Sequence, residues 1–312
     1  MNNYSIDVEV SEVGPRDGLQ SISPILPTEA KKCWISALAA AGVPEVEVGS
    51  FVPAKVLPQL ADTAELVEHA RGIEGLRVAV LAPNFRGAQD AIRAGAHKIT
   101  IPLSVSETHS LKNVRRTHAQ MLEEVSRIAG LIRETPENQR PDFEGGLSTA
   151  FGCTLEGPVA PERVVQLAEA LMQAGCDEVG LSDTTGYGTP DQVRDLTRAV
   201  WRAVGRDRLT GIHLHNTRGQ GLANVVAALD VGLRTIDASM GGIGGCPFAP
   251  GASGNIVTED LVFLLEGMGY RTGINMERLL EARQVLRDSL PEEIELYGFT
   301  PEAGLPKGFR YA

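Results

Sequence analysis

Short apolar runs and amphipathic segments alternate along the chain from one end to the other. Eight apolar runs have the length and pattern of β-strands: Asp7–Val13, Glu45–Phe51, Leu76–Leu81, Lys98–Val105, Glu144–Phe151, Glu178–Ser182, Thr210–His215 and Thr235–Met240. Each is followed by a segment with the pattern of a helix: Pro27–Ala41, Thr63–Ala70, Gly87–Ala94, His118–Arg133, Pro161–Ala174, Pro190–Val204, Leu222–Leu229 and Asn255–Glu266. This strict alternation predicts a parallel sheet whose strands are joined by right-handed helical crossovers.

Eight strand–helix units favour a closed (β/α)8 TIM barrel, an α/β fold, over an open sheet. Such a barrel needs about 250 residues, and the chain has 312. An open dinucleotide-binding sheet would carry GxGxxG directly after its first strand, whereas Gly14–Gly18 reads GPRDG. A ninth helical pattern covers Met276–Leu290, so we expect residues 274–312 to form a helical extension outside the barrel. No linker or low-complexity run interrupts the chain, and we expect one catalytic domain over residues 1–312.

Composition and charge narrow the range of partners. Hydrophobic residues make up 43% of the chain and charged residues 22%, as in soluble globular proteins. The formal net charge of −11 argues against a nucleic-acid partner held by general electrostatics, although a local basic pocket for an anion is compatible with it. The longest apolar stretches fall far short of the roughly 20 residues that cross a bilayer, so we expect no membrane partner.

The N-terminus and the cysteines favour the cytoplasm. The first ten residues, MNNYSIDVEV, lack the basic and apolar regions of a signal peptide. The four cysteines, Cys33, Cys153, Cys176 and Cys246, are widely spaced and form no CxxC pair, so we expect neither a disulfide framework nor a structural zinc site. Cys33 and Cys176 lie in apolar helical patterns, and we expect both in the core.

Polar residues at the C-terminal ends of the strands are the candidates for chemistry, because the active site of a (β/α)8 barrel lies there. They are Arg16, Asp17, Gln20, Glu47, Ser50, Ser104, Ser106, Glu107, His109, Thr149, Cys153, Asp183, Thr184, Thr185, His213, His215, Asn216, Cys246 and Asn255.

The sequence His213-Leu214-His215 predicts a metal site. Alternate residues of a strand point to the same side, so both imidazoles face the lumen. Asp17 follows the first strand, which neighbours the eighth in a closed barrel, and Asn255 begins the helix after the eighth strand. Two ring nitrogens and two oxygens without a thiolate suit Mg²⁺ or Mn²⁺ better than structural zinc. Iron, cobalt and catalytic zinc are alternative metals for the site. The alternative to any metal site is that the two histidines are hydrogen-bonded residues of the core.

A Gly-rich segment and an arginine offer further chemistry. Gly241–Pro247 (GGIGGCP) has four glycines in five positions and predicts a loop that hinges over the barrel mouth. Its Cys246 could protonate a carbanion or act as a nucleophile, unless the thiol is incidental. Arg16 suits the stabilisation of an enolate oxygen, with Glu47 as the ion-pair partner that positions it.

On these motifs the chain resembles the 3-hydroxy-3-methylglutaryl-CoA (HMG-CoA) lyase family, among the metal-dependent barrel lyases and aldolases that include isopropylmalate synthase. The matching stretches are Glu12–Gln20 (EVGPRDGLQ), Ser50–Gln59 (SFVPAKVLPQ), Ser148–Cys153 (STAFGC), Ser182–Pro190 (SDTTGYGTP) and Gly241–Asn255 (GGIGGCPFAPGASGN). The last stretch is the most specific, because the isopropylmalate and homocitrate synthases share the HxH and RD motifs but not this loop.

The resemblance implies a role for each matching residue. The implied metal ligands are Asp17, His213, His215 and Asn255. The implied catalytic residues are Arg16 for the enolate, Asp17, Glu47 beside Arg16, Asp183 after the sixth strand, His213, and Cys246 as the lid cysteine. Gln20 and Ser50 match positions that line the substrate pocket.

The reaction implied by the resemblance is a metal-assisted retro-Claisen cleavage of HMG-CoA to acetyl-CoA and acetoacetate. Either Asp17 or His213 is the general base, and Cys246 is the acid that protonates the enolate of acetyl-CoA. The resemblance also implies an acyl-CoA substrate, a place in leucine degradation and a homodimer.

The chain departs from the family at its second histidine. Members carry HxHDTYG, whereas His213–Gly219 reads HLHNTRG, with Asn216 in place of an acid and Arg218 in place of an aromatic residue. Arg218 either binds an extra substrate carboxylate or faces solvent, so another 3-hydroxyacyl-CoA such as citramalyl-CoA is an alternative substrate. A Claisen-type condensing synthase is a second alternative. A basic cluster after the fourth strand is either a contact for CoA phosphates or a solvated face: Lys112, Arg115, Arg116 and His118.

Overall fold

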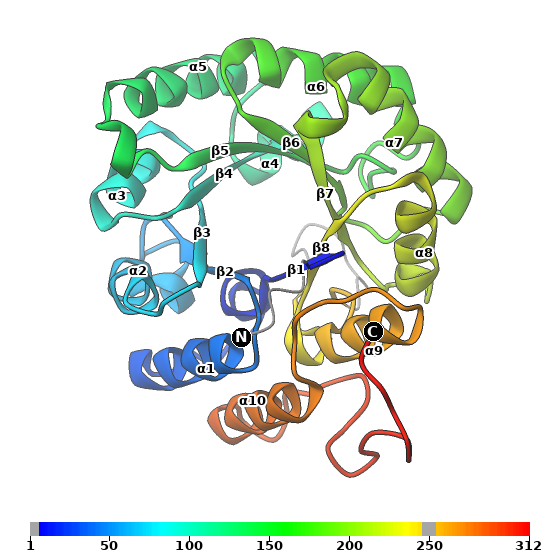
Figure 1. Cartoon of the computed structure of the whole chain (residues 1–312). Helices are drawn as coiled ribbons and strands as arrows, with labels where there is room; N and C mark the ends of the chain where they lie inside the picture. Colours follow the sequence, from blue (N-terminus) through cyan, green and yellow to red (C-terminus); the bar gives the residue numbers. More distant parts are fainter. Residues whose placement is uncertain (1–5, 245–253) are drawn as a thin grey trace.

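Eight parallel strands close into a barrel in the computed structural model, which describes residues 6–244 and 254–312 (Figure 1). The strands are β1 (Glu9–Glu12), β2 (Glu45–Ser50), β3 (Arg77–Leu81), β4 (Lys98–Ser104), β5 (Asp142–Ser148), β6 (Glu178–Asp183), β7 (Leu209–Leu214) and β8 (Thr235–Ala238). Each strand pairs with the next, and β8 closes the ring on β1, with Val10 opposite Ile236. The predicted (β/α)8 barrel is confirmed.

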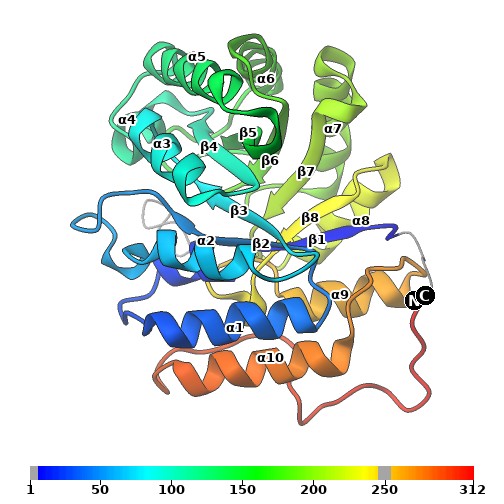
Figure 2. The same ribbon diagram turned by 60° about the vertical axis from the view of Figure 1, so that its left-hand side comes forward.

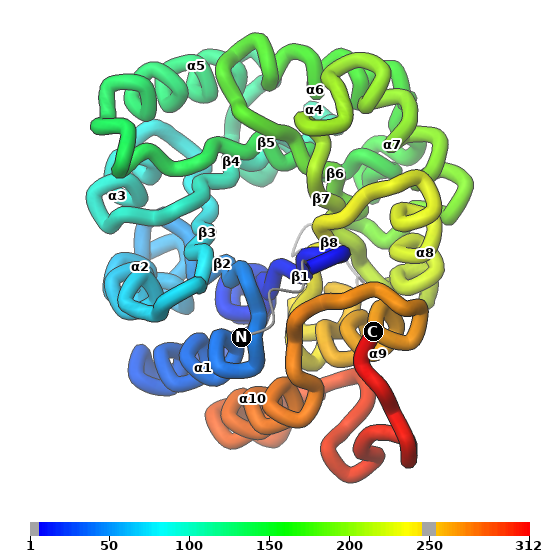
Figure 3. Tube along the Cα trace, viewed as in Figure 1, coloured from blue at the N-terminus to red at the C-terminus, as the bar shows by residue number. Residues whose placement is uncertain are grey.

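The helices surround the ring of strands, as the chain trace shows (Figure 3). They are α1 (Thr28–Ala40), α2 (Thr63–Arg71), α3 (Phe85–Ala94), α4 (Glu107–Asn113), α5 (His118–Glu134), α6 (Pro161–Ala174), α7 (Pro190–Val204), α8 (Gly221–Val231), α9 (Thr258–Gly267) and α10 (Met276–Ser289). The predicted ranges of α6 and α7 are the observed ones. In both, a proline in the first turn supplies a backbone that is already helical and lacks an unpaired N–H.

Three predicted boundaries are wrong. Between the predicted strand Lys98–Val105 and the predicted helix His118–Arg133 lies a further helix, α4, which is capped where the Ser106 hydroxyl accepts from the His109 N–H. Strand β5 ends at Ser148 rather than Phe151, because Thr149 takes a left-handed backbone with φ of 57° and turns the chain. Helix α9 begins at Thr258, so Asn255 lies in the segment before it.

The hydrophobic core lies between the strands and the helices. Leu214 and Ile236 are fully or almost fully buried and point outward from the barrel, whereas their neighbours His213 and Asp237 line the interior cavity. At the N-terminal end of the barrel the buried ammonium of Lys98 lies 2.6 Å from a carboxylate oxygen of Glu144. This alternation of side chains leaves the polar groups in the lumen and the apolar ones against the helices.

The C-terminal extension packs beside the first helix. Helix α10 runs alongside α1 (Figure 2), and its Arg278 donates to the Ala40 carbonyl oxygen at 3.0 Å. Residues 290–312 form turns and irregular chain, so the extension is helical only over α10. The Tyr297 N–H donates to the carbonyl oxygen of Gly241, which joins the extension to the segment after β8.

The cysteines divide by exposure. Cys176 is buried as expected, but the expectation that Cys33 lies in the core is wrong, because that residue is on the exposed side of α1. Cys246 lies outside the described residues. Among the helices of residues 6–244 and 254–312, none has the length and apolar character needed to cross a membrane.

Candidate active site

A tight turn after β1 carries Arg16 and Asp17 to the mouth of the barrel. The turn covers Gly14–Gly18, and the Asp17 N–H donates to the Val13 carbonyl oxygen at 2.7 Å. A Cβ atom on Gly18 would lie 2.6 Å from a side-chain atom of Ile243. Glycine is therefore needed there because the turn packs closely against the segment after β8.

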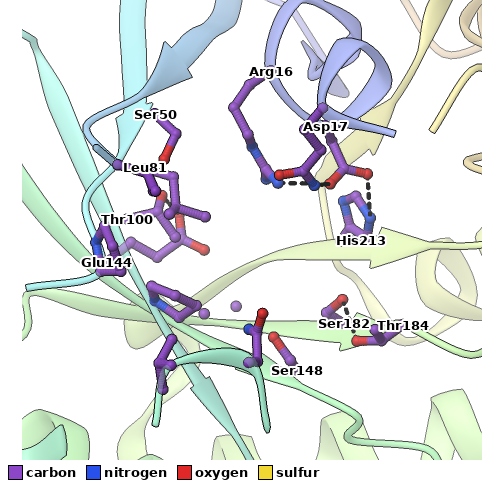
Figure 4. Close-up of a pocket in the computed structure, with 18 of the residues that line it drawn as sticks. Arg16, Asp17, Ser50, Leu81, Thr100, Glu144, Ser148, Ser182, Thr184 and His213 are labelled. Atoms are coloured by element: carbon purple, nitrogen blue, oxygen red, sulfur yellow. Dashed lines mark hydrogen bonds and ion pairs between the residues drawn. The ribbon is translucent and has the colours of Figure 1, made fainter. Parts of the chain in front are cut away.

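Arg16 is held by two carboxylates. Its Nε donates to Glu47 Oε2 and its Nη1 donates to Asp17 Oδ1, both at 2.6 Å. Burial disfavours the charged guanidinium, but Glu47 and Asp17 outweigh that effect and raise the Arg16 pKa. Burial in turn raises the pKa of Glu47 to about 7, against the opposing effect of Arg16. The ion pair predicted between Arg16 and Glu47 is present. Figure 4 shows the Arg16 guanidinium beside Asp17 at the cavity.

The two histidines meet Asp17 in one cluster. The Nε2 atoms of His213 and His215 are 3.1 Å apart, and Asp17 Oδ2 lies 3.8 Å from the first and 4.0 Å from the second. All three ligand atoms lie within 4.8 Å of one another. Two donors that each bind one Mg²⁺ ion at about 2.1 Å lie at most about 4.2 Å apart, so these three side chains could hold one divalent ion between them.

Asn255 completes the cluster from the other side. Its Nδ2 donates to Asp17 Oδ2 at 2.8 Å, while its Oδ1 is buried and has no hydrogen-bond partner among residues 6–244 and 254–312. A buried acceptor without a partner is costly, and a cation would satisfy it. The four residues predicted as ligands therefore lie together: Asp17, His213 and His215 form the cluster, and Asn255 contacts it through Asp17.

The protonation states of the cluster suit a cation. Burial raises the pKa of Asp17, but Arg16 and the histidines outweigh it and lower the pKa to about 2. Burial and the neighbouring His213 lower the pKa of His215 to about 4. His215 is thus neutral and Asp17 ionised near pH 7, the forms in which both side chains bind metal.

A cavity of about 780 Å³ opens beside the cluster. Arg16, Asp17, Gln20, Ser50 and His213 all line it, and Figure 4 shows Arg16, Asp17 and His213 on one side with Ser50 nearby. Gln20 donates to Asp17 Oδ1 at 2.5 Å, so it also orients the carboxylate. The structure thus brings the predicted pocket residues Gln20 and Ser50 to the same space as the cluster.

Two predicted site residues have other partners. Asp183 accepts the N–H groups of Tyr187 and Gly188, and burial raises its pKa to about 6. Arg218 donates to the carbonyl oxygens of Thr185 and Gly186 and lies over the Tyr187 ring. Both side chains therefore hold the loop after β6. Neither is among the residues that line the cavity. Arg218 is exposed, as in the alternative in which it faces solvent.

Glu12 is a functional neighbour that the sequence did not reveal. Its carboxylate is buried and accepts the N–H groups of Gly14 and Met240 and the hydroxyl of Thr258. Burial raises its pKa to about 8. Glu12 thereby joins the turn after β1, the end of β8 and the start of α9. It is the last residue of β1 and pairs with Ala238, so it shares the outward face of the strand with Val10, and no motif in the sequence marks a carboxylate on that face.

Three of the four residues of the basic cluster after β4 line the cavity. Lys112, Arg115 and Arg116 line the cavity, and Arg116 also pairs with Glu124 at 3.1 Å. His118 is buried away from them, and its Nε2 is hydrogen-bonded to the Ser104 carbonyl oxygen. Arg115 takes a left-handed backbone with φ of 57°. The cavity therefore has a cationic rim on the side opposite Asp17.

Fold and site together define a class: a (β/α)8 barrel with a candidate divalent-metal centre at the strand ends and an arginine beside it. A family model described as HMGL-like matches residues 7–286, and the chain belongs to this family. It is 40% identical over 290 residues to the mitochondrial hydroxymethylglutaryl-CoA lyase of Mus musculus, covering 93% of this chain and 88% of that protein.

Two further relatives agree. The cytoplasmic 3-hydroxy-3-methylglutaryl-CoA lyase of Rattus norvegicus is 39% identical, with 88% of this chain and 79% of that protein covered. Among solved structures, an HMG-CoA lyase from Acinetobacter baumannii in complex with coenzyme A and 3-methylmalate superposes with a TM-score of 0.89. It is 37% identical, and the match covers 100% of both chains.

Proposed function

We propose that this chain is a carbon–carbon lyase that cleaves HMG-CoA to acetyl-CoA and acetoacetate. The observation that carries the proposal is the cluster of Asp17, His213 and His215 beside the fixed guanidinium of Arg16, at one cavity. Relatives at about 40% identity over nine-tenths of the chain carry the name of this activity. The cluster supplies what the reaction needs, namely acid–base groups and a cation for the enolate.

Asp17, His213, His215 and Asn255 would hold a divalent metal ion, with Mg²⁺ or Mn²⁺ preferred by their nitrogen and oxygen donors. When bound, such an ion acts as a Lewis acid toward the substrate hydroxyl and a neighbouring oxygen.

The side chains then divide the reaction between them. Asp17 or His213 takes the proton of the tertiary hydroxyl. As the ketone C=O forms, the C2–C3 bond breaks and its electrons pass into the enolate of acetyl-CoA. Arg16, held by Glu47, stabilises the enolate oxygen. A proton delivered to the enolate carbon, for which we propose the Cys246 thiol, completes acetyl-CoA and leaves acetoacetate.

The cationic rim suits the phosphates of coenzyme A. Lys112 and Arg115 line the cavity and are exposed, so their charges are available to an anionic ligand. The rim is local, which reconciles an anionic substrate with the net charge of −11.

We further propose one catalytic domain, a homodimer and a cytoplasmic location with a role in leucine degradation. The packing of α10 on α1 and the hydrogen bond from Tyr297 to Gly241 support the inclusion of residues 274–312 in the catalytic domain. The named relatives include both mitochondrial and cytoplasmic lyases.

The test is turnover of a substrate panel by the purified protein with Mg²⁺ or Mn²⁺. We expect acetyl-CoA and acetoacetate from HMG-CoA in equal amounts by liquid chromatography and mass spectrometry. Turnover of citramalyl-CoA alone would change the substrate but keep the chemistry. Condensation of acetyl-CoA with 2-oxo acids, without cleavage of any 3-hydroxyacyl-CoA, would show a synthase and overturn the proposal.

A further inference from the structure

Asp237 lines the cavity and has no part in the reaction proposed above. It lies on β8 directly opposite His213 on β7, as Cα partners in the parallel register. Its Oδ2 is 3.2 Å from His213 Nδ1, and the carboxylate lines the same cavity as Arg16 and Asp17. Its neighbours on the strand, Ile236 and Ala238, are fully buried against the helix layer. The pleat of β8 therefore directs Asp237 into the lumen.

The contact selects one tautomer of His213. An ionised carboxylate only accepts hydrogen bonds, so the proton of a neutral His213 ring must lie on Nδ1. The lone pair of Nε2 then points toward Asp17 and toward His215, whose Nε2 is 3.1 Å away. A lone pair aimed into this cluster is what a metal ligand must offer.

His215 has no comparable support. Its Nδ1 is buried and has no hydrogen-bond partner in the part of the chain that the structure describes. The ring is instead fixed by close packing, since only 4% of the residue is exposed. Of the two histidines, His213 therefore depends on a hydrogen bond for its tautomer and orientation, and Asp237 is the group that supplies it.

We propose that Asp237 is a positioning residue that sets the tautomer and the ring orientation of His213 for metal binding. The proposal rests on the proposed function for the identity of the cluster as a metal centre. In many metal sites a carboxylate that does not touch the metal accepts the second ring N–H of a histidine ligand and so orients it. Asp237 would have this role beside the four candidate ligands.

The first measurement is the affinity for Mn²⁺ without substrate, from the signal of free Mn²⁺ in electron paramagnetic resonance titrations. Removing an outer carboxylate costs about 10–100-fold in metal affinity, and we expect a loss of this size in Asp237→Ala. Asp237→Asn keeps an acceptor oxygen opposite Nδ1, so we expect a smaller loss. Thr235→Ser is the matched control, two residues earlier on the same strand and lumen face, and should bind Mn²⁺ as the parent does.

The second measurement reads the tautomer itself. Two-bond ¹H–¹⁵N spectra of the imidazoles at pH 8.5 should show His213 protonated at Nδ1 in the parent, and a mixture of tautomers in Asp237→Ala. An unchanged tautomer in that variant, or unchanged Mn²⁺ affinity in both variants, would overturn the inference while leaving the proposed function intact. If the parent itself bound no Mn²⁺, the metal centre would be wrong, and the tautomer spectra would still decide the role of Asp237.

Discussion

A buried ion pair links the C-terminal extension to the barrel, and its removal gives a quantitative prediction. Arg283 of α10 donates to Glu259 of α9 at 2.5 Å, with side-chain exposures of only 5% and 0%. Glu259 also accepts the N–H of Gly241, and Arg283 donates to the carbonyl oxygens of Leu296 and Tyr297. The perturbation is Arg283→Met, which keeps the volume but leaves the carboxylate without its cation.

Two estimates of the destabilisation agree. Breaking a buried pair by removing one partner costs about 3–5 kcal/mol. Glu259 can avoid this cost by taking up a proton, and neutralising a carboxyl of ordinary pKa 4.5 at pH 7 costs about 3.4 kcal/mol at about 1.4 kcal/mol per pH unit. At pH 5 the same step costs only about 0.7 kcal/mol.

The sign of the pH dependence follows from proton binding. Burial raises the pKa of Glu259 even beside Arg283, whose charge and hydrogen bond oppose the shift, so removing Arg283 raises that pKa further. The folded variant therefore keeps a proton on Glu259 to a higher pH than the folded parent does. Stability relative to the parent must therefore fall as the pH rises from 5 to 7. The assay is equilibrium urea unfolding, followed by circular dichroism at both pH values for parent and variant.

Arg287→Met is the matched control. Arg287 lies one turn further along α10 and donates to the carbonyl oxygens of Ile294 and Pro291, but it contacts no carboxylate in the described part of the chain. Arg287→Met should therefore lower the free energy of unfolding only slightly, and by the same amount at pH 5 and pH 7. A deficit below about 1 kcal/mol for Arg283→Met at pH 7, or an equal deficit at pH 5 and pH 7, would refute the reasoning, since the expected cost is several times larger.

Three further predictions concern the site. Cys246→Ala should lower kcat by about 10²–10⁴-fold with unchanged Mn²⁺ affinity, and a fully active variant would remove that thiol from the mechanism. Burial lowers the pKa of His213, but Asp237 and Asp17 outweigh it and raise the value above its usual one. Metal binding near pH 6 should therefore release a proton from His213, and this release should decline as the pH is raised to 9. Calorimetry in buffers of different ionisation enthalpy measures the release, and equal release at both pH values would contradict the prediction. Glu47→Gln should lower kcat about 10–100-fold by loosening Arg16, with little change in metal affinity; unchanged kcat would argue against a positioning role.

Much of the fold was predictable because it depends on local periodicity. The alternation of apolar strands and amphipathic helices predicts eight units, and a proline in the first turn marks the starts of α6 and α7. Helix α4 was missed because seven mostly polar residues carry too little apolar periodicity to distinguish a helix from a loop. The exposed position of Cys33 was missed because its helical neighbours, rather than Cys33 itself, form the buried stripe.

The candidate ligands were predictable for a similar reason. His213 and His215 share a strand face by the two-residue repeat, and barrel closure brings Asp17 beside them. The motifs that resemble the HMG-CoA lyases supplied Asn255, which spacing alone would not have selected.

The chain by itself determined which elements form and which residue types stand at their ends, because helix and strand preferences act over a few residues. Only the tertiary structure decided which side chains meet. Asp237 contacts His213 because two parallel strands pair in one register, and a shift of one residue would turn that carboxylate into the helix layer. Likewise, Arg283 finds Glu259 only because α10 packs against α1 and α9 on the outside of the barrel, a tertiary contact that helix preference alone does not select.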